Sequence, residues 1–274
     1  MSVPRAAQRS VGPHSMAPEE AKALLAGDFG KKLHKTACAY CHPLFWAVRT
    51  DSGRWKIKRN GTAFFLDCGK GPFLVTAAHV YEDYVSDLQK ENGKVFGSLG
   101  SVPFQMEKRL VACLGQKTLD IATFTVNEKE VADSGKNVLV GGQKSWPPDP
   151  VKEGEGVLFA GFPGNQRIEE EQKLECNFGL YSALTPVSSV SDRHFGCAFE
   201  RSEWLDTMGM GLPEEGFDLG GISGCPVLAL KESSAGVISW SLAGVGYNAA
   251  TSLGEIFLAH HARAVNPDGT LNKP

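Results

Sequence analysis

The sequence has no apolar run long enough to cross a membrane and no strong excess of charge. No segment of its 274 residues approaches the about 18 consecutive apolar residues of a membrane-spanning helix. The 28 Lys and Arg residues nearly balance the 31 Asp and Glu residues, which leaves a formal net charge of −3. We therefore expect neither a membrane nor a nucleic acid as a partner. The chain is long enough to enclose a substantial apolar core.

Cysteine is also sparse, with seven residues, an odd number and far below the density of a disulfide scaffold. We interpret these cysteines as free thiols of a chain from a reducing compartment, where cysteine behaves as a small buried apolar residue. Residues 1–15 lack the apolar segment of a secretory signal, so we expect a cytoplasmic location. Apolar and charged fractions of 42% and 22% are typical of a folded globular protein.

Short apolar runs separated by turn residues indicate an all-β fold. Residues 1–35 are expected to form an N-terminal extension that is partly disordered and carries a short helix over residues 17–25. The expected strands cover residues 37–48, 55–57, 62–66, 73–77, 109–114, 121–126, 157–162, 177–184, 226–230, 237–247 and 256–259. A short helix is expected near the C-terminus, around residues 260–265.

The clearest internal boundary is the segment of residues 141–156, which is rich in proline and glycine. Proline cannot join a central ladder, so this segment is typical of a linker. It divides the β region into residues 36–145 and residues 146–274. A functional site at the interface of two such halves is a common arrangement.

Three motifs in the order His, Asp, Ser indicate nucleophilic catalysis. His79 follows an apolar run, Asp120 precedes another, and Ser223 lies in the glycine-flanked turn Gly221-Ile222-Ser223-Gly224. A serine hydroxyl holds its proton tightly and needs a neighbouring base, and a histidine oriented by a carboxylate is such a base. We expect Ser223 as the nucleophile, His79 as the general base and then acid, and Asp120 as the orienting carboxylate. Gly221 allows a close backbone approach, so the N–H groups of Gly221 and Ser223 are expected to form an oxyanion hole.

These motifs resemble those of the trypsin-like serine peptidases, which have the chymotrypsin fold. The matching segments are Thr76-Ala77-Ala78-His79, Asp120-Ile121-Ala122, Gly221-Ile222-Ser223-Gly224-Cys225-Pro226, Gly61-Thr62-Ala63-Phe64 and Gly161-Phe162-Pro163-Gly164. The resemblance covers residues 36–265. It implies two antiparallel six-stranded β-barrels, one carrying His79 and Asp120 and the other Ser223. It also implies hydrolysis of protein or peptide substrates through an acyl-enzyme, with no cofactor and no metal.

Three positions differ from the secreted animal members of that family. Val80 stands where those members have a disulfide cysteine, and Ile222 stands where they have an acidic residue that pairs with a newly cleaved N-terminus. Cys225 replaces a glycine. The chain is therefore closer to the bacterial or intracellular branches, and we expect no activation of the trypsin type.

The resemblance leaves the substrate preference open. It implies that Phe217 and Asp218 lie at the base of the S1 pocket. A carboxylate there would favour a Lys or Arg side chain, whereas the Phe217 ring would favour an apolar or small one. Gly246 and Tyr247 are expected on the strand that binds the substrate backbone, although Ser239-Trp240-Ser241 is an alternative register for that strand.

Two other functions stay open at this point. The first is a catalytically latent or inactive protein of the same fold, acting as a peptide-binding scaffold or needing an activating protein partner. The second rests on Cys38-Ala39-Tyr40-Cys41-His42, which matches a c-type haem attachment motif and contains three potential zinc ligands. A strand whose cysteines face the core explains the same five residues, and no second cysteine pair completes a zinc site.

Overall fold

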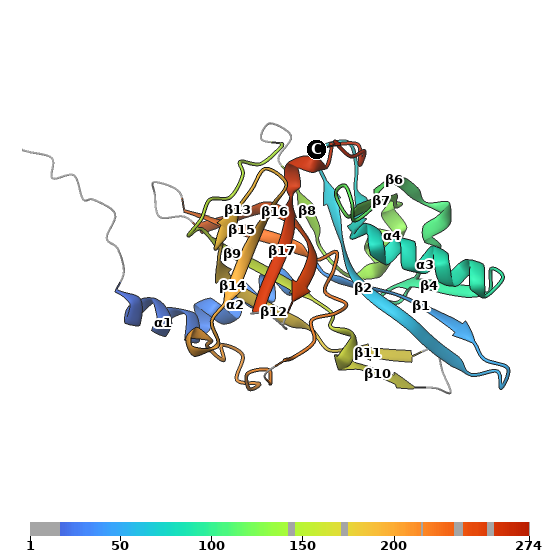
Figure 1. Ribbon diagram of the computed structural model, residues 1–274, viewed down its shortest axis with the longest axis horizontal. Coiled ribbons are helices and arrows are strands. Elements are labelled where there is room, and N and C mark those ends of the chain that lie inside the picture. Colours follow the sequence, from blue (N-terminus) through green and yellow to red (C-terminus); the bar gives the residue numbers. More distant parts are fainter. Residues whose placement is uncertain are drawn as a thin grey trace, which may run out of the picture.

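The computed structural model describes residues 17–141, 146–170, 175–214, 216–232, 238–250 and 255–273. Strands dominate these ranges and form two large sheets and one two-stranded ribbon (Figure 1). The mainly β architecture expected from the sequence is confirmed, with more helix than an all-β fold would have. The disorder expected at the start of the chain falls on residues outside the described ranges.

The first sheet contains the strands that precede the expected linker. Its order is β5-β4-β1-β2-β3-β7-β6, with β8 paired to β2. The strands are β1 (His42–Arg49), β2 (Trp55–Asp67), β3 (Phe73–Thr76), β4 (Val95–Leu99), β5 (Val102–Pro103), β6 (Leu110–Leu114), β7 (Ile121–Thr125) and β8 (Val138–Val140). The pairs are antiparallel except β2 with β8, which is parallel. Strand β2 is therefore the central strand, bordered in turn by β1, β3 and β8.

The second sheet contains most strands after the expected linker. Its order is β12-β9-β15-β16-β17-β14-β13. The strands are β9 (Gly156–Gly161), β12 (Tyr181–Pro186), β13 (Ser189–Val190), β14 (His194–Phe199), β15 (Pro226–Glu232), β16 (Ile238–Ala250) and β17 (Glu255–His261), and the separate ribbon pairs β10 (Arg167–Glu170) with β11 (Glu175–Phe178). The single strand expected over residues 177–184 is thus divided between β11 and β12. All of these pairs are antiparallel.

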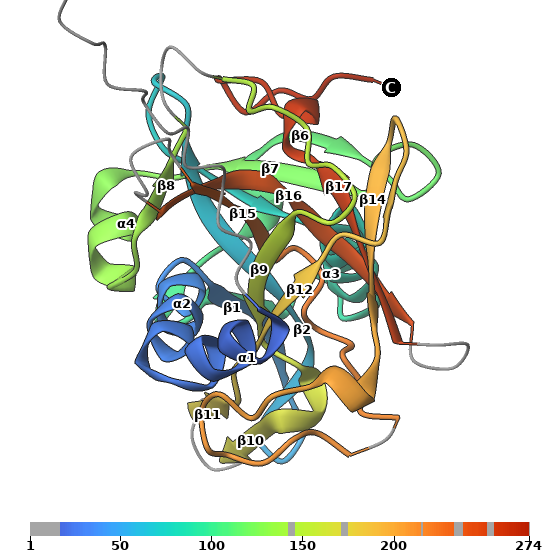
Figure 2. The same ribbon diagram turned by 90° about the vertical axis from the view of Figure 1, so that its left-hand side faces the viewer.

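Two helices precede the first strand, of which the second packs against the second sheet and the first packs against the second helix (Figure 2). Helix α1 (Pro18–Ala26) occupies the expected position, and helix α2 (Asp28–Cys38) follows it directly. One apolar cluster joins α2 to β9, and its buried members are Leu33, Ala37, Cys41, Leu158, Ala160 and Phe162. Helix α2 ends at Cys38, three residues after residue 35.

The strand expected over residues 37–48 is wrong in its first part, because residues up to Cys38 are helical. Leu33 and Ala37 are buried on one side of α2, and Cys41 lies just beyond its end in the same cluster. This spacing of four residues is the period of an amphipathic helix and not of a strand. Strand β1 begins only at His42.

Helix α3 (Ala78–Lys90) directly follows β3 and was not expected from the sequence. Its buried side chains include Val80, Tyr84 and Asp87, which repeat every three or four residues and face the first sheet. The indole N–H of Trp46 donates a hydrogen bond of 2.9 Å to Asp87 Oδ2. This bond ties α3 to β1 and so supports the helix on which His79 lies.

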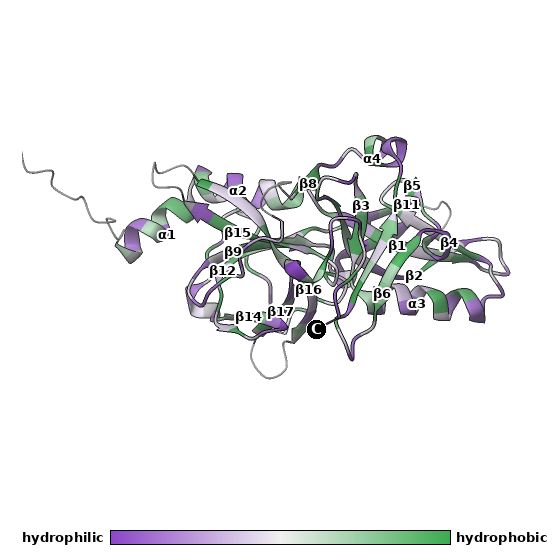
Figure 3. Ribbon diagram, turned by 90° about the horizontal axis from the view of Figure 1, so that it is seen from above, coloured by the Kyte–Doolittle hydropathy of each residue, from purple (hydrophilic) through white to green (hydrophobic). Residues whose placement is uncertain are grey.

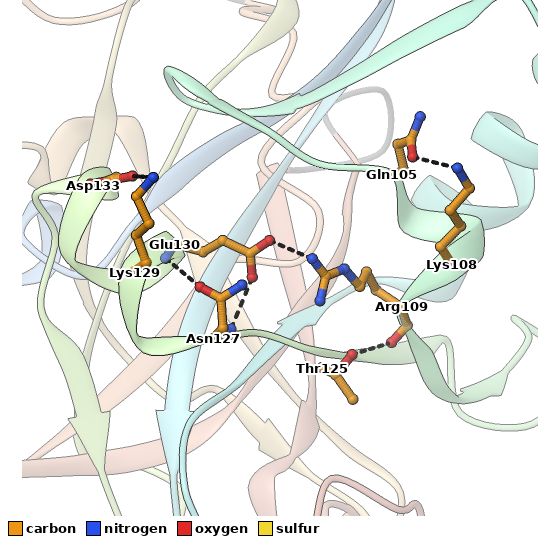
Figure 4. A network of polar contacts seen from close by, with 8 residues as sticks. All are labelled: Gln105, Lys108, Arg109, Thr125, Asn127, Lys129, Glu130 and Asp133. Carbon is orange, nitrogen blue, oxygen red and sulfur yellow. Dashed lines mark hydrogen bonds and ion pairs between the residues drawn. The ribbon is translucent and has the colours of Figure 1, made fainter.

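Helix α4 (Glu128–Ser134) is held by a capping box and an ion pair (Figure 4). Asn127 Oδ1 accepts from the backbone N–H of Glu130 at 2.8 Å, and Glu130 Oε2 accepts from the backbone N–H of Asn127 at 2.9 Å. The other oxygen of Glu130 pairs with Arg109 at 2.8 Å, which joins α4 to the segment before β6. The Gly135 φ of 65° ends the helix in the left-handed conformation.

Short 3₁₀ turns complete the described elements, at Met106–Lys108, Gly164–Gln166, Arg201–Glu203 and Ala262–Ala264. The expected C-terminal helix is only the last of these turns. Among the described residues, no helix has the length and apolar character needed to cross a bilayer.

The two sheets share an apolar core where they meet. Hydrophobic residues run along the strands of both sheets, whereas hydrophilic residues are frequent on α3 (Figure 3). The shared core includes Phe64, Leu66, Phe73, Val75 and Ile121 from the first sheet and Leu228, Leu242 and Val245 from the second. The core therefore fixes the position of one sheet relative to the other.

We expect Trp46→Phe to destabilise the protein by about 1.5–3 kcal/mol, because a buried hydrogen bond to a charged group is lost. Urea unfolding followed by circular dichroism measures this change. Trp55→Phe is the matched control, since the Trp55 ring packs on Phe96 and its N–H has no hydrogen-bond partner among the described residues. Equal destabilisation by both substitutions would show that the bond to Asp87 contributes nothing.

Candidate active site

His79 lies in the first turn of α3, three residues after Thr76, the last residue of β3 that pairs with β7. Strand β3 ends at Thr76 and helix α3 begins at Ala78. Ala77 between them is the N-cap residue of the helix and has extended φ and ψ. The His79 side chain is 25% exposed. Its ring is therefore partly buried and still accessible to a substrate.

Asp120 occupies the turn before β7 and is nearly completely buried, with 1% exposure. Its φ is 45°, in the left-handed region that Asp tolerates better than most residues. The carbonyl oxygen of Gly115 accepts from the backbone N–H groups of Thr118, Leu119 and Asp120, at 2.8, 3.1 and 3.2 Å. The turn thus holds the backbone of Asp120 in a sparsely populated conformation. Residues in such conformations are concentrated at functional sites.

His79 and Asp120 make two hydrogen bonds to each other. The ring Nδ1 of His79 lies 2.8 Å from Asp120 Oδ2, and the backbone N–H of His79 donates to Oδ1 at 2.9 Å. A carboxylate only accepts, so Nδ1 carries the proton in this bond. In the neutral imidazole the lone pair is then on Nε2, which is the atom that can act as a base.

The surroundings of His79 raise its pKa above the ordinary value of 6.5. Burial by itself lowers this pKa, but the hydrogen bond to Asp120 and the charge of that carboxylate outweigh burial. Asp83 and Glu82 add smaller contributions in the same direction. Because the pKa of His79 is higher in the folded protein than in the unfolded chain, the protonated ring adds to the free energy of unfolding. This contribution is fully present below the unfolded-state pKa of His79 and is lost as the pH rises through its folded-state pKa.

Ser223 lies on a tight turn between Leu219 and β15. The backbone N–H of Ile222 donates to the Leu219 carbonyl at 3.1 Å, and that of Cys225 donates to the Ile222 carbonyl at 3.0 Å. Two glycines make this turn possible, with φ of 102° at Gly221 and 91° at Gly224. A Cβ on Gly224 would lie 2.1 Å from the carbonyl oxygen of Thr62, so no other residue fits there.

The turn brings Ser223 close to the end of β3. A Cβ on Gly224 would lie only 2.9 Å from the backbone nitrogen of Ala77, two residues before His79. The Ser223 hydroxyl donates to the carbonyl oxygen of Tyr247 at 3.3 Å. Among the described residues it makes no hydrogen bond to His79.

The backbone N–H groups of Gly221 and Ser223 have no hydrogen-bond partner among the described residues. The carbonyl groups of Gly220, Gly221, Ile222 and Ser223 are all bound. Gly164 N–H donates to Gly220 O at 2.7 Å, Thr62 Oγ1 donates to Gly221 O at 2.9 Å, and Thr62 N–H donates to Ser223 O at 2.9 Å. The turn therefore offers two donors and no acceptor of its own, which suits a developing negative charge.

Thr62 and Gly164 were not identified as site residues from the sequence. Both lie in segments that the family resemblance included, Gly61-Thr62-Ala63-Phe64 and Gly161-Phe162-Pro163-Gly164. The sequence carries no signal that these two segments bond to the serine turn. The segments are about a hundred residues apart from each other, and each is more than fifty residues away from Ser223.

Both residues expected at the base of the S1 pocket have defined contacts in the structure. The Phe217 ring stacks on Tyr181, with centroids 6.0 Å apart, and packs against the core of the second sheet. Asp218 is exposed, and its Oδ1 accepts from the backbone N–H of Gly220 at 2.7 Å. Its carboxylate therefore belongs to the loop before the serine turn.

The two residues expected on the substrate-binding strand both contact the serine turn. Gly246 donates to the Cys225 carbonyl at 2.9 Å and accepts from Gly224 N–H at 2.7 Å. The Tyr247 ring stacks on His260, with centroids 4.0 Å apart. Burial raises the pKa of Tyr247 and the charge of Asp120 raises it further. This part of β16 thus borders Ser223.

The Cys38 to His42 motif does not form a ligand cluster. Cys38 ends α2, and the Cys41 thiol is buried and donates to the Ala37 and Ala160 carbonyls at 3.2 and 3.0 Å. His42 begins β1, and burial lowers its pKa to about 3. In the described part of the chain, no three His, Cys, Asp or Glu side chains are grouped so that they could hold a metal ion.

Comparisons with known proteins add little to this site. No protein-family model and no curated protein matches the chain. A solved structure from work on the coupled folding and binding of the intrinsically disordered Sesbania mosaic virus VPg protein matches with 14% identity and a TM-score of 0.40. That match covers 81% of this chain and 85% of the other. A likeness at this level carries no argument about function.

We expect Asp120→Asn to lower the pKa of His79, because the substitution removes the charge and the acceptor that favour the imidazolium. Titration of the histidine ring protons by NMR measures the shift, which should move the pKa from above 6.5 in the wild type to a lower value. His34 is an internal control, since its ring bonds to Ser182 and burial lowers its pKa. A His79 pKa that does not respond to Asp120→Asn would contradict the assigned pairing.

Proposed function

We propose that this protein is a serine endopeptidase of the trypsin-like type. The observation that carries the proposal is the double hydrogen bond between His79 and Asp120, which leaves Nε2 as the only basic atom of the ring. The neighbouring turn supplies a serine hydroxyl and two unpartnered N–H groups, at Gly221 and Ser223. A nucleophile, an oriented base and an anion site are the parts that acyl transfer needs.

In the proposed reaction, Ser223 Oγ attacks the carbonyl carbon of a peptide bond while His79 Nε2 takes the hydroxyl proton. Asp120 holds the Nδ1–H and stabilises the imidazolium that forms. The carbonyl oxygen becomes an oxyanion and accepts from the N–H groups of Gly221 and Ser223. His79 then gives its proton to the leaving amine, and a water molecule hydrolyses the acyl-enzyme by the same steps in reverse.

The proposal includes the two-barrel fold that the family resemblance implies. The two sheets meet in one shared core, and His79 and Asp120 come from the first while Ser223 precedes a strand of the second. The buried Ile222, with 2% exposure, packs in the apolar core of the second sheet. An apolar side chain in this position makes no ion pair with a new N-terminus, so we propose that the site forms without proteolytic processing.

The contacts of Asp218 and Phe217 favour one of the two substrate preferences. Asp218 is exposed and already accepts a hydrogen bond from Gly220. Phe217 is half-buried, and its ring is apolar. We therefore propose an apolar or small side chain, and not Lys or Arg, on the substrate residue whose carbonyl is attacked.

One observation favours the alternative of a latent protein. The Ser223 hydroxyl bonds to the Tyr247 carbonyl, so attack requires a rotation of the serine side chain toward His79. Catalytic hydrogen bonds are often incomplete before substrate binds, and a side-chain rotation leaves the backbone of the turn unchanged. A latent protein would need an activating protein partner to bring the two side chains together.

All seven cysteines are free thiols, and burial raises the pKa of Cys41, Cys68 and Cys225. Seven free thiols without a disulfide bond are typical of a compartment that keeps cysteine reduced. We extend the proposal to a reducing compartment such as the cytoplasm, with protein or peptide substrates.

A fluorophosphonate probe tests the proposed function. The purified protein, with no partner added, should become covalently labelled at Ser223 and cleave a peptide library. Ser223→Ala should abolish labelling and reduce kcat by about 10⁶-fold, because the nucleophile is lost. Labelling should increase as the pH rises through the pKa of His79, since only the neutral ring accepts the serine proton.

Ser182→Ala provides the control for this experiment, because it removes a serine hydroxyl that bonds to a different histidine, His34. It should leave labelling unchanged. A folded wild-type protein that is neither labelled nor able to cleave any peptide would contradict the proposed activity. Labelling only after a cell extract is added would favour the latent alternative.

A further inference from the structure

Thr62 connects the first sheet to the serine turn and to the second sheet. It lies in β2 and is completely buried. Its backbone N–H donates to Ser223 O at 2.9 Å, and its carbonyl accepts from Thr76 Oγ1 at 2.6 Å. Its hydroxyl donates to Gly221 O at 2.9 Å and accepts from the backbone N–H of Phe162 at 3.0 Å. Every polar group of this residue is therefore bonded.

The segment Phe162-Pro163-Gly164 provides the second support of the serine turn. The N–H of Gly164 donates to the carbonyl of Gly220 at 2.7 Å. The carbonyl of Phe162 accepts from Asn60 Nδ2 at 2.8 Å, and Asn60 Oδ1 in turn accepts from Arg167 at 3.1 Å. This segment is thus bonded to β2 at Phe162, through Asn60 and Thr62, and to the serine turn at Gly164.

These bonds determine where the Gly221 N–H points. The peptide bond between Gly220 and Gly221 is trans, so its C=O and N–H groups point in opposite directions. The C=O is bonded to Gly164, and the N–H must therefore point away from the Phe162-Pro163-Gly164 segment. The next carbonyl, that of Gly221, is held by the Thr62 hydroxyl. With both flanking carbonyls bonded, the peptide has no freedom to turn its N–H away from the anion site.

We propose that the Thr62 hydroxyl is a positioning group that keeps the oxyanion hole formed before substrate binds. This inference rests on the proposed peptidase function, which it deepens. Thr62 does not touch the reacting atoms. It acts through Gly221 directly and through Phe162 and Gly164 indirectly. A preformed hole needs no reorganisation when the oxyanion develops, which is the condition under which such donors are most effective.

The test compares three purified variants in a peptide cleavage assay. Thr62→Val keeps the side-chain shape and removes the hydroxyl, so kcat should fall by about 10²-fold, the effect of losing one oxyanion donor. KM should change little, because the ground-state substrate does not use that donor fully. Thr62→Ser keeps the hydroxyl and should retain most of the wild-type kcat.

Thr123→Val is the matched control. Thr123 is also a completely buried threonine of the first sheet, and its hydroxyl donates to Gly269 O at 2.6 Å, away from the serine turn. It should lose stability without a comparable loss of kcat. The acid limb of the pH profile should stay the same in Thr62→Val, because the His79 and Asp120 pair is intact. Equal kcat for Thr62→Val and wild type, or equal losses in Thr62→Val and Thr123→Val, would overturn the inference.

A readout that does not require activity separates this inference from the proposed function. The Phe162 N–H has the Thr62 hydroxyl as its hydrogen-bond partner, so its amide hydrogen should be protected in wild type and exchange faster in Thr62→Val. A protein with this exchange pattern and no peptidase activity would leave the positioning role of the Thr62 hydroxyl standing and refute the proposed function. An active wild-type enzyme whose Phe162 amide exchanges equally in wild type and Thr62→Val would refute the positioning role alone.

Discussion

The close contact between the serine turn and strand β2 is the constraint on which the site depends. Gly224 lies so near the carbonyl of Thr62 that a Cβ would be 2.1 Å from that oxygen. The same contact places the turn beside Ala77 and therefore beside His79. Backbone groups meet here across the two sheets, and each buried polar group must find a partner. Thr62 donates to the carbonyl groups of Gly221 and Ser223 and so provides partners for them. Close packing and hydrogen bonding together therefore select one conformation of the serine turn.

The burial of Asp120 provides the electrostatic part of the same arrangement. A carboxylate with 1% exposure is costly unless donors compensate for the lost water, and His79 supplies two. The carboxylate in turn holds the ring and raises its pKa. Stability and reactivity are coupled in this pair, because the contact that compensates the buried charge also leaves Nε2 as the basic atom.

The sequence predicted the mainly β fold and the order of the three candidate residues, because both leave local signals. Apolar runs bounded by turn residues mark most strands, and glycines flank Ser223. Local sequence patterns gave wrong secondary structure where contacts between distant segments determine the conformation. Residues 37–41 contain a mixed run that is apolar enough for a strand, yet packing on β9 makes its start helical. Helix α3 was missed because its buried residues follow directly on a strand, with no capping residue to mark its start.

The identities of His79, Asp120 and Ser223, and their positions next to elements, are determined by the sequence alone. Each depends on residues within a few positions along the chain, such as the glycines that permit positive φ. Only the tertiary structure decided that Thr62, Asn60 and Gly164 hold the serine turn and that Asp218 bonds within its own loop. The reason is physical: a hydrogen bond between segments a hundred residues apart leaves no periodicity in either segment, and it exists only once the sheets have packed.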